Sequence, residues 1–107
     1  MKNLTTTAEA GADRTRLFIT GELDLTTRDD LINAAARALE QTSTLLDLDL
    51  AGVSFCDSSG LSGVLAVARL AETAGKRMVV SNPAPQVHRT LYISGVLDRL
   101  TDRGAGD

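Results

Sequence analysis

The stretch "LLDLDLAGVSFCDSSGLSG", residues 45–63, predicts a β-strand that passes directly into an α-helix. Over its first six residues apolar and acidic side chains alternate, as they do on the two faces of a strand. The leucines share one face, and Asp47 and Asp49 share the other. Because the second face is acidic, we expect it to be exposed and without a chemical role, with helices covering the leucine face alone.

A helix over residues 58–74 is indicated by the spacing of the apolar residues that follow the strand. The predicted buried stripe consists of Leu61, Val64, Leu65, Ala68 and Ala71. The opposite face carries small or partly polar residues, namely Ser59, Ser62, Gly63, Ala66, Leu70 and Thr73. A partner surface can approach a face of small side chains closely, so this face is a candidate interface.

The junction between strand and helix contains typical helix-capping residues. Either Asp57 or Ser58 is expected to be the N-cap, since its side chain can accept hydrogen bonds from the free amides of the first turn. Gly60 is unusual in a first turn, because glycine costs roughly 1 kcal/mol of helix stability relative to alanine. Its presence predicts that another part of the backbone lies close to this turn.

Strand and helix patterns alternate along the rest of the chain. Gly21 is expected to end the second strand, and the first helix has two candidate capping boxes, Thr26 with Asp29 or Thr27 with Asp30. The expected strands cover residues 4–9, 17–20, 45–50 and 78–80, and the expected helices cover residues 27–41, 58–74 and a short segment that begins at the prolines of residues 82–85.

This order predicts an α/β fold with a four- to five-stranded mixed sheet and helices packed mainly on one face. We expect one domain over residues 1–107, with a core from about 14 to 100. A last short element is expected at residues 96–100, followed by a frayed tail at 101–107.

Composition excludes several functional classes. The 107 residues carry a net charge of −3 and only 3% aromatic residues, which argues against nucleic-acid binding. Cys56 is the only cysteine and is expected to be buried, so neither a disulfide nor a cysteine-based zinc site is possible within the chain. No apolar run suggests a signal peptide or a membrane span. We therefore expect a cytoplasmic protein without metal, cofactor or membrane contact.

Two catalytic interpretations of the junction are disfavoured by the sequence. A hydrolase nucleophile on a strand–turn–helix elbow needs G-x-S-x-G, which is absent here, and the candidate base His88 has no evident orienting carboxylate. A phosphate-binding loop at Gly75-Lys76 lacks the following hydroxyl residue, because Arg77 stands in its place. No catalytic residue is therefore expected, and the chain is not expected to be an enzyme.

Three segments together resemble the STAS domain of bacterial anti-sigma factor antagonists, over roughly residues 14–100. They are "FITGELDLTTRDDL" (18–31), "LDLAGVSFCDSSGLSGVL" (48–65) and "NPAPQVHRTLYISGVLDRL" (82–100). The resemblance implies a small STAS-like domain that binds an anti-sigma factor serine kinase and thereby releases a sigma factor. It also implies that the kinase phosphorylates the domain, which ends binding, and that a phosphatase resets it.

The resemblance also assigns roles to particular residues. It implies that Ser58 is the phosphoacceptor, with Ser59 as the less favoured neighbour, and that Asp57 helps to position the acceptor. The partner-binding residues that it implies are Gly21, Glu22, Asp24, Asp57, Ser58, Ser59, Gly60, Ser62, Gly63 and Ala66. Ser62 departs from the family pattern, because many members have glycine there.

A second hypothesis is a constitutive STAS scaffold, or a subunit of a larger regulatory or transport complex. Such a protein would use the same helix face without phosphotransfer. It would be indifferent to ATP and to substitution of Ser58, whereas the switch would not.

Overall fold

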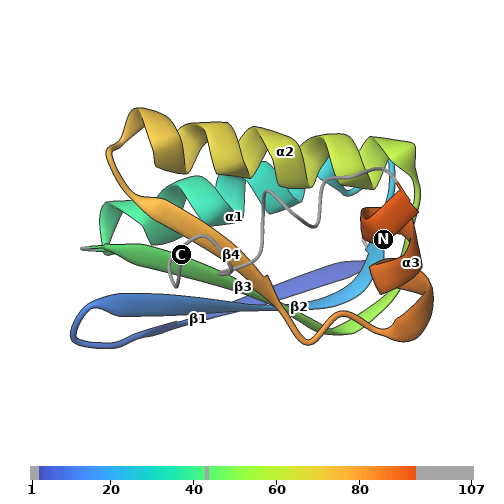
Figure 1. The fold of residues 1–107 in the computed structure, drawn as a ribbon, viewed down its shortest axis with the longest axis horizontal. Coiled ribbons are helices and arrows are strands. Elements are labelled where there is room, and N and C mark those ends of the chain that lie inside the picture. Colours follow the sequence, from blue (N-terminus) through green and yellow to red (C-terminus); the bar gives the residue numbers. More distant parts are fainter. Residues whose placement is uncertain (1–2, 43, 94–107) are drawn as a thin grey trace.

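The computed structural model describes residues 3–42 and 44–93, which form one sheet with three helices (Figure 1). The sheet has four strands in the order β1-β2-β3-β4. β1 pairs antiparallel with β2, whereas β2, β3 and β4 are mutually parallel. The elements are β1 (Leu4–Ala10), β2 (Arg14–Leu23), α1 (Arg28–Glu40), β3 (Leu45–Cys56), α2 (Ser58–Thr73), β4 (Arg77–Ser81) and α3 (Pro85–Ile93).

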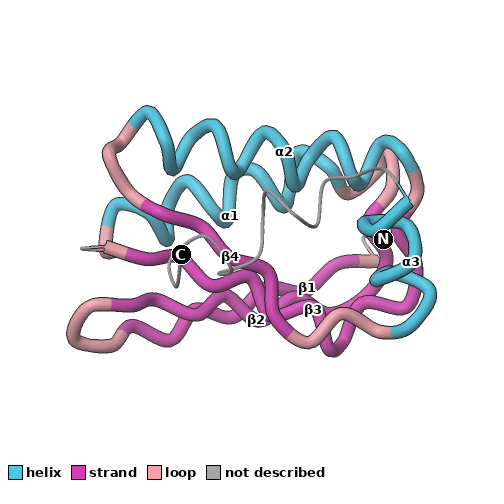
Figure 2. The backbone as a smooth tube through the Cα atoms, in the orientation of Figure 1, coloured by secondary structure: helices cyan, strands magenta, loops and turns pink. Residues whose placement is uncertain are grey.

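The predicted α/β class and mixed sheet are confirmed. α1 and α2 lie side by side over one face of the sheet, and the short α3 lies at the end of the domain where α2 begins (Figures 1 and 2). The leucine face of β3 points into this layer, and Leu46, Leu48 and Leu50 are all fully buried. Burying a leucine side chain contributes about 1.5–3 kcal/mol, so this stripe anchors the core.

Two strands are longer than the sequence predicted. β2 continues through Gly21 to Leu23, and β3 continues past Leu50 to Cys56. Gly21 lies within the strand rather than at its end, and it adopts a φ of +122° beside a shift in the register between β2 and β3. A side chain there would also collide with the backbone of Asn3, so the position requires glycine.

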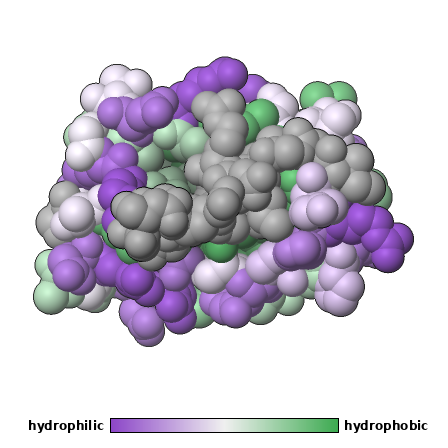
Figure 3. Space-filling view, in the orientation of Figure 1, coloured by the Kyte–Doolittle hydropathy of each residue, from purple (hydrophilic) through white to green (hydrophobic). Residues whose placement is uncertain are grey.

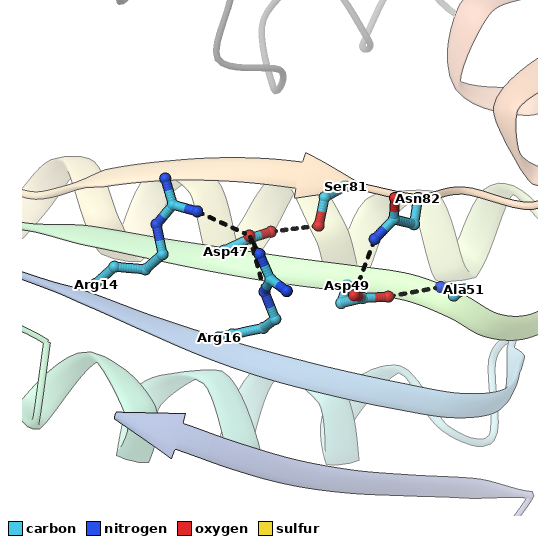
Figure 4. Close-up of polar contacts among 7 residues, drawn as sticks. All are labelled: Arg14, Arg16, Asp47, Asp49, Ala51, Ser81 and Asn82. Carbon is cyan, nitrogen blue, oxygen red and sulfur yellow. Dashed lines mark hydrogen bonds and ion pairs between the residues drawn. The ribbon is translucent and has the colours of Figure 1, made fainter. Parts of the chain in front are cut away.

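The acidic face of β3 is buried, so the expected exposure of Asp47 and Asp49 was wrong. Their exposed fractions are only 2% and 6%. Asp47 accepts a hydrogen bond from the hydroxyl of Ser81 at 2.6 Å and pairs with the guanidinium of Arg16 at 3.2 Å (Figure 4). The Arg14 guanidinium lies 3.7 Å from the same carboxylate. Side chains from β2 and β4 thus replace water around a carboxylate in the centre of the sheet.

The buried Asp49 carboxylate is also hydrogen-bonded, by a residue of its own strand and by the residue that follows β4. One carboxylate oxygen accepts a hydrogen bond from the Ala51 amide at 2.9 Å, and the other accepts one from the Asn82 side chain at 3.0 Å (Figure 4). The two aspartates therefore tie three neighbouring strands together rather than forming a solvated surface.

Neither predicted capping box forms at the start of α1. Thr27 is the N-cap, but its hydroxyl makes no capping hydrogen bond. It donates instead to the carbonyl of Glu22 at 2.7 Å and accepts from the amide of Asp24 at 3.0 Å. Tying down the preceding loop uses the hydroxyl that the capping box would need.

The buried face of α2 is rotated from the predicted stripe. The buried residues are Gly60, Gly63, Val64, Val67 and Ala71, while Leu61, Leu65 and Ala68 are half-buried. The rotation follows from two glycines that let α2 approach neighbouring segments closely. Lys76 donates a hydrogen bond to the Leu39 carbonyl at 2.6 Å, a carbonyl near the end of α1 that also accepts from the Thr42 amide at 3.1 Å.

The predicted element at 96–100 and the predicted tail at 101–107 lie outside the described residues. Within the described ranges, no helix has the length and apolar character needed to cross a bilayer. On the face shown in Figure 3, hydrophilic side chains are spread over the helix layer as well as the sheet.

Candidate functional site

The passage from β3 to α2 is a capped helix start. Asp57 is the N-cap with extended backbone, and its carboxylate accepts a hydrogen bond from the Gly60 amide at 2.9 Å. Its carbonyl accepts the first helical hydrogen bond, from Leu61 at 2.9 Å. Of the two predicted caps, the structure selects Asp57. Ser58 is consequently the first residue of the helix, with its hydroxyl free of the capping role.

The end of β2 packs directly on this helix start. The Asp57 amide donates a hydrogen bond to the carbonyl of Leu23 at 3.1 Å. A methyl group placed on Gly60 would lie 2.6 Å from the carbonyl carbon of Leu23. The close backbone approach that Gly60 predicted is therefore present, and the neighbouring segment belongs to the Gly21–Leu23 end of β2.

Hydrogen bonds fix the loop that continues from β2 to α1. The Asp24 carboxylate accepts from the Thr26 hydroxyl at 2.7 Å and from the Thr26 amide at 2.9 Å. These bonds, the Thr26 hydroxyl first, lower the pKa of Asp24 below its usual value, although partial desolvation opposes them. The carboxylate is thus held charged and in one position in the loop that leads from β2 to α1.

The serines at the helix start differ in accessibility. Ser58 and Ser62 are exposed, whereas Ser59 and Ala66 are half-buried. Gly60 and Gly63 are buried, so neither presents its own atoms on the face proposed for a partner. They shape that face indirectly, because they allow the end of β2 and the start of α1 to approach α2.

Sequence comparison assigns the chain to a family. The family model described as "Mlab, STAS domain" matches residues 6–102. The chain belongs to the STAS-domain family. Within that family it is a relative of the anti-sigma factor antagonists: the Anti-sigma F factor antagonist of Lysinibacillus sphaericus is 35% identical over 82 residues, which cover 76% of this chain and 68% of that protein.

Solved structures of anti-sigma factor antagonists share the fold of this STAS domain. The anti-sigma factor antagonist SpoIIAA in its unphosphorylated form superposes with a TM-score of 0.74 at 25% identity, covering 96% of this chain and 98% of that one. The Bacillus cell fate determinant SpoIIAA in its phosphorylated form gives 0.67 at 24% identity, covering 91% and 89%. The predicted STAS-like fold is confirmed.

The structure of this STAS domain brings most of the predicted partner residues together. Gly21, Glu22 and Asp24 flank Leu23 along the chain, and Leu23 contacts both Asp57 and Gly60. Two segments about thirty-five residues apart in the chain therefore meet at the end of the domain where α2 begins (Figure 1).

The sequence analysis missed two residues beside this surface. Leu25 is 75% exposed at the turn before α1, which is unusual for a leucine in a loop held by hydrogen bonds. Arg28 starts α1 and crosses to α2, where its Nε donates to the hydroxyl of Ser62 at 3.3 Å. The spacing of apolar residues carries no signal for either residue, because both depend on how the two helices pack.

His88 is not placed to assist the serines. It lies exposed on α3, and its ring stacks on Tyr92 with centroids 6.3 Å apart. Among the described residues no hydrogen bond joins it to Ser58 or Ser59. The described residues contain no group of three or more His, Cys, Asp or Glu side chains able to hold a metal ion.

Proposed function

We propose that this STAS domain is a binding protein controlled by phosphorylation of Ser58. Its unphosphorylated form binds an anti-sigma factor that is a serine kinase, and this binding releases a sigma factor. The kinase transfers the γ-phosphoryl group of ATP to the Ser58 hydroxyl: the new O–P bond forms, the bond to ADP breaks and the hydroxyl proton is released. The phosphorylated form no longer binds, and a phosphatase restores it by hydrolysis.

The observation that carries the proposal is the position of Ser58. It is exposed at the first residue of α2, directly after a cap that is already supplied by Asp57. A kinase can reach its hydroxyl without breaking the hydrogen bonds from the Gly60 and Leu61 amides to Asp57 that begin the helix. The similarity to anti-sigma factor antagonists, one of them solved in a phosphorylated form, supports the same assignment.

A phosphate on Ser58 is expected to change the binding of the partner without unfolding the domain. It adds a charge of about −1.5 to −2 at a helix N-terminus, where free amides and the helix dipole stabilise anions. The surface around it already carries Glu22, Asp24 and Asp57. A partner fitted to neutral Ser58 would meet a bulky dianion, and a penalty of roughly 3–4 kcal/mol lowers affinity a few hundred-fold.

The proposal is tested with three baits, wild type, Ser58→Asp and Ser58→Ala, in lysate of the source bacterium. Wild type should capture an ATP-binding kinase that the Ser58→Asp variant does not capture. The captured kinase should phosphorylate wild type and should not phosphorylate Ser58→Ala, although Ser58→Ala should still bind it. If all three baits retain the same proteins and ATP changes nothing, the chain is instead a constitutive scaffold or a subunit of a larger regulatory or transport complex.

A further inference from the structure

We infer that Arg28 is an internal binding residue for the phosphate on Ser58. This inference rests on the proposed function, because it concerns the phosphorylated form of the same site. It adds a regulatory element that the sequence did not indicate, namely an arginine on α1 that binds the serine on α2 once that serine is phosphorylated.

The first observation is the path of the Arg28 side chain. Its Cγ lies over Gly63, where a methyl group would approach it to 3.2 Å. Its Nε then reaches the hydroxyl of Ser62. The absence of a side chain at Gly63 thus lets the arginine lie flat across α2 and bring its guanidinium to the exposed face.

The second observation is the relation between Ser62 and Ser58. Ser62 follows Ser58 by four residues, and residues with this spacing are neighbours on a helix surface, with Cβ atoms about 5–6 Å apart. Helical side chains lean towards the N-terminus, so the hydroxyl of Ser62 is directed back towards Ser58. A guanidinium that contacts Ser62 is therefore about one helical turn from the phosphorylation site.

The third observation is that the present partners of Arg28 are weak. Its Nη1 lies 3.0 Å from the Asp29 carboxylate, but the Asp29 side chain is 85% exposed. Exposed ion pairs of this kind contribute about 0–1 kcal/mol. A phosphate carries more charge than a carboxylate and accepts two parallel hydrogen bonds from a guanidinium, so it competes effectively for Arg28.

The consequence is a phosphorylated form that is stabilised by an ion pair within the domain. Arg28 moves from Asp29 to the phosphate and joins the start of α1 to the start of α2. The pair offsets part of the repulsion between the phosphate and Asp57, and it alters the face that Ser62 shares with the site. Ser62 itself helps to position the arginine before phosphorylation.

The test uses a chain that carries phosphoserine at position 58 through site-specific incorporation, so that no kinase is needed. The second ionisation of the phosphate is followed by ³¹P NMR across a pH titration. Arg28→Gln should raise the phosphate pKa by about half a unit, because a nearby cation favours the dianion. Arg28→Lys should restore part of the shift, since it keeps the charge and loses the planar fork.

Arg69→Gln is the matched control. Arg69 is an exposed arginine on the same helix, three turns beyond Ser58, so its loss removes the same charge without touching the site. Equal phosphate pKa values in wild type and Arg28→Gln, or equal shifts in Arg28→Gln and Arg69→Gln, would overturn the inference. Neither result bears on whether phosphorylation controls partner binding, so the two proposals fail separately.

Discussion

The backbone of Leu23 occupies the space where a side chain on Gly60 would begin: a Cβ there would lie 2.6 Å from the Leu23 carbonyl carbon and 2.7 Å from its Cβ. This contact joins the end of β2 to the first turn of α2. It joins the segment that carries Glu22 and Asp24 to the segment that carries Asp57 and Ser58, and the proposed function depends on this junction.

Replacing Gly60 with alanine should therefore destabilise the domain and disturb the site. The obstructing atoms are the backbone and Cβ of Leu23, which cannot rotate away, and we expect a loss of about 2 kcal/mol or more in the free energy of unfolding. Urea denaturation measures this directly.

The matched control is Gly63→Ala on the same helix. A methyl group there meets the flexible Arg28 side chain at 3.2 Å and Leu31 at 3.5 Å. The gain in helix propensity, roughly 1 kcal/mol, offsets the crowding. Similar unfolding midpoints for the two alanine variants would show that the Leu23–Gly60 contact is not restrictive.

Asp57 should contribute to stability through its cap rather than its charge. Asp57→Ala removes the acceptor of the Gly60 amide and should cost about 1 kcal/mol, whereas Asp57→Asn keeps an acceptor and should lose little. Asp29→Ala, at an exposed position in the first turn of α1, serves as the control and should change stability by less than about 0.5 kcal/mol. The account fails here if Asp57→Ala unfolds at the same urea concentration as Asp29→Ala.

Cys56 should be an unreactive thiol, and it should make the stability of the domain depend on pH in the alkaline range. Burial, together with the charge of Asp57, raises its pKa to about 11 from 9.0. The folded state thus disfavours the thiolate, so the stabilisation is complete below pH 9 and is lost as the pH rises towards 11. Cys56→Ala should flatten the stability profile in that window.

Thiol labelling provides the second measurement on Cys56. At pH 8 a disulfide reagent should label the folded protein far more slowly than the urea-unfolded protein, because only the thiolate reacts. Equal labelling rates in the two states would mean that the thiol is accessible and ionises normally.

Asp47 should be structural and remote from partner binding. Asp47→Ala leaves the Ser81 hydroxyl without its 2.6 Å acceptor and removes the partner of Arg16, so we expect a loss of roughly 2–3 kcal/mol. Phosphorylation of Ser58 by the kinase should continue at an unchanged rate below the melting temperature. An unaltered melting temperature would contradict the cross-strand role assigned to this carboxylate.

The sequence predicted those features that depend on neighbours along the chain. Alternation placed the leucines of β3 on the core face, and the residue types at the junction predicted a cap at Asp57 or Ser58, which the structure places at Asp57. Gly60 was informative because a glycine in a first turn has a local cost that only a close contact explains.

Features that depend on distant residues were predicted poorly. Asp47 and Asp49 have the pattern of an exposed face, but Arg16, Ser81 and Asn82 reach them from other strands or from the end of one. The spacing of Thr27 and Asp30 is that of a capping box, yet the Thr27 hydroxyl is used by the preceding loop. The contact between Arg28 and Ser62 arises from the packing of two helices. The spacing of residues along the sequence gives no information about that packing.

The most direct test of the central claim compares two forms of the same chain with the purified anti-sigma factor kinase. Binding is measured by calorimetry for the unphosphorylated chain and for the chain fully phosphorylated at Ser58, without ATP. We predict that phosphorylation raises the Kd at least about a hundred-fold, which is a loss of roughly 2.7 kcal/mol in binding free energy. The far-UV circular dichroism spectrum should stay the same. Equal dissociation constants for two equally folded forms would contradict the switch.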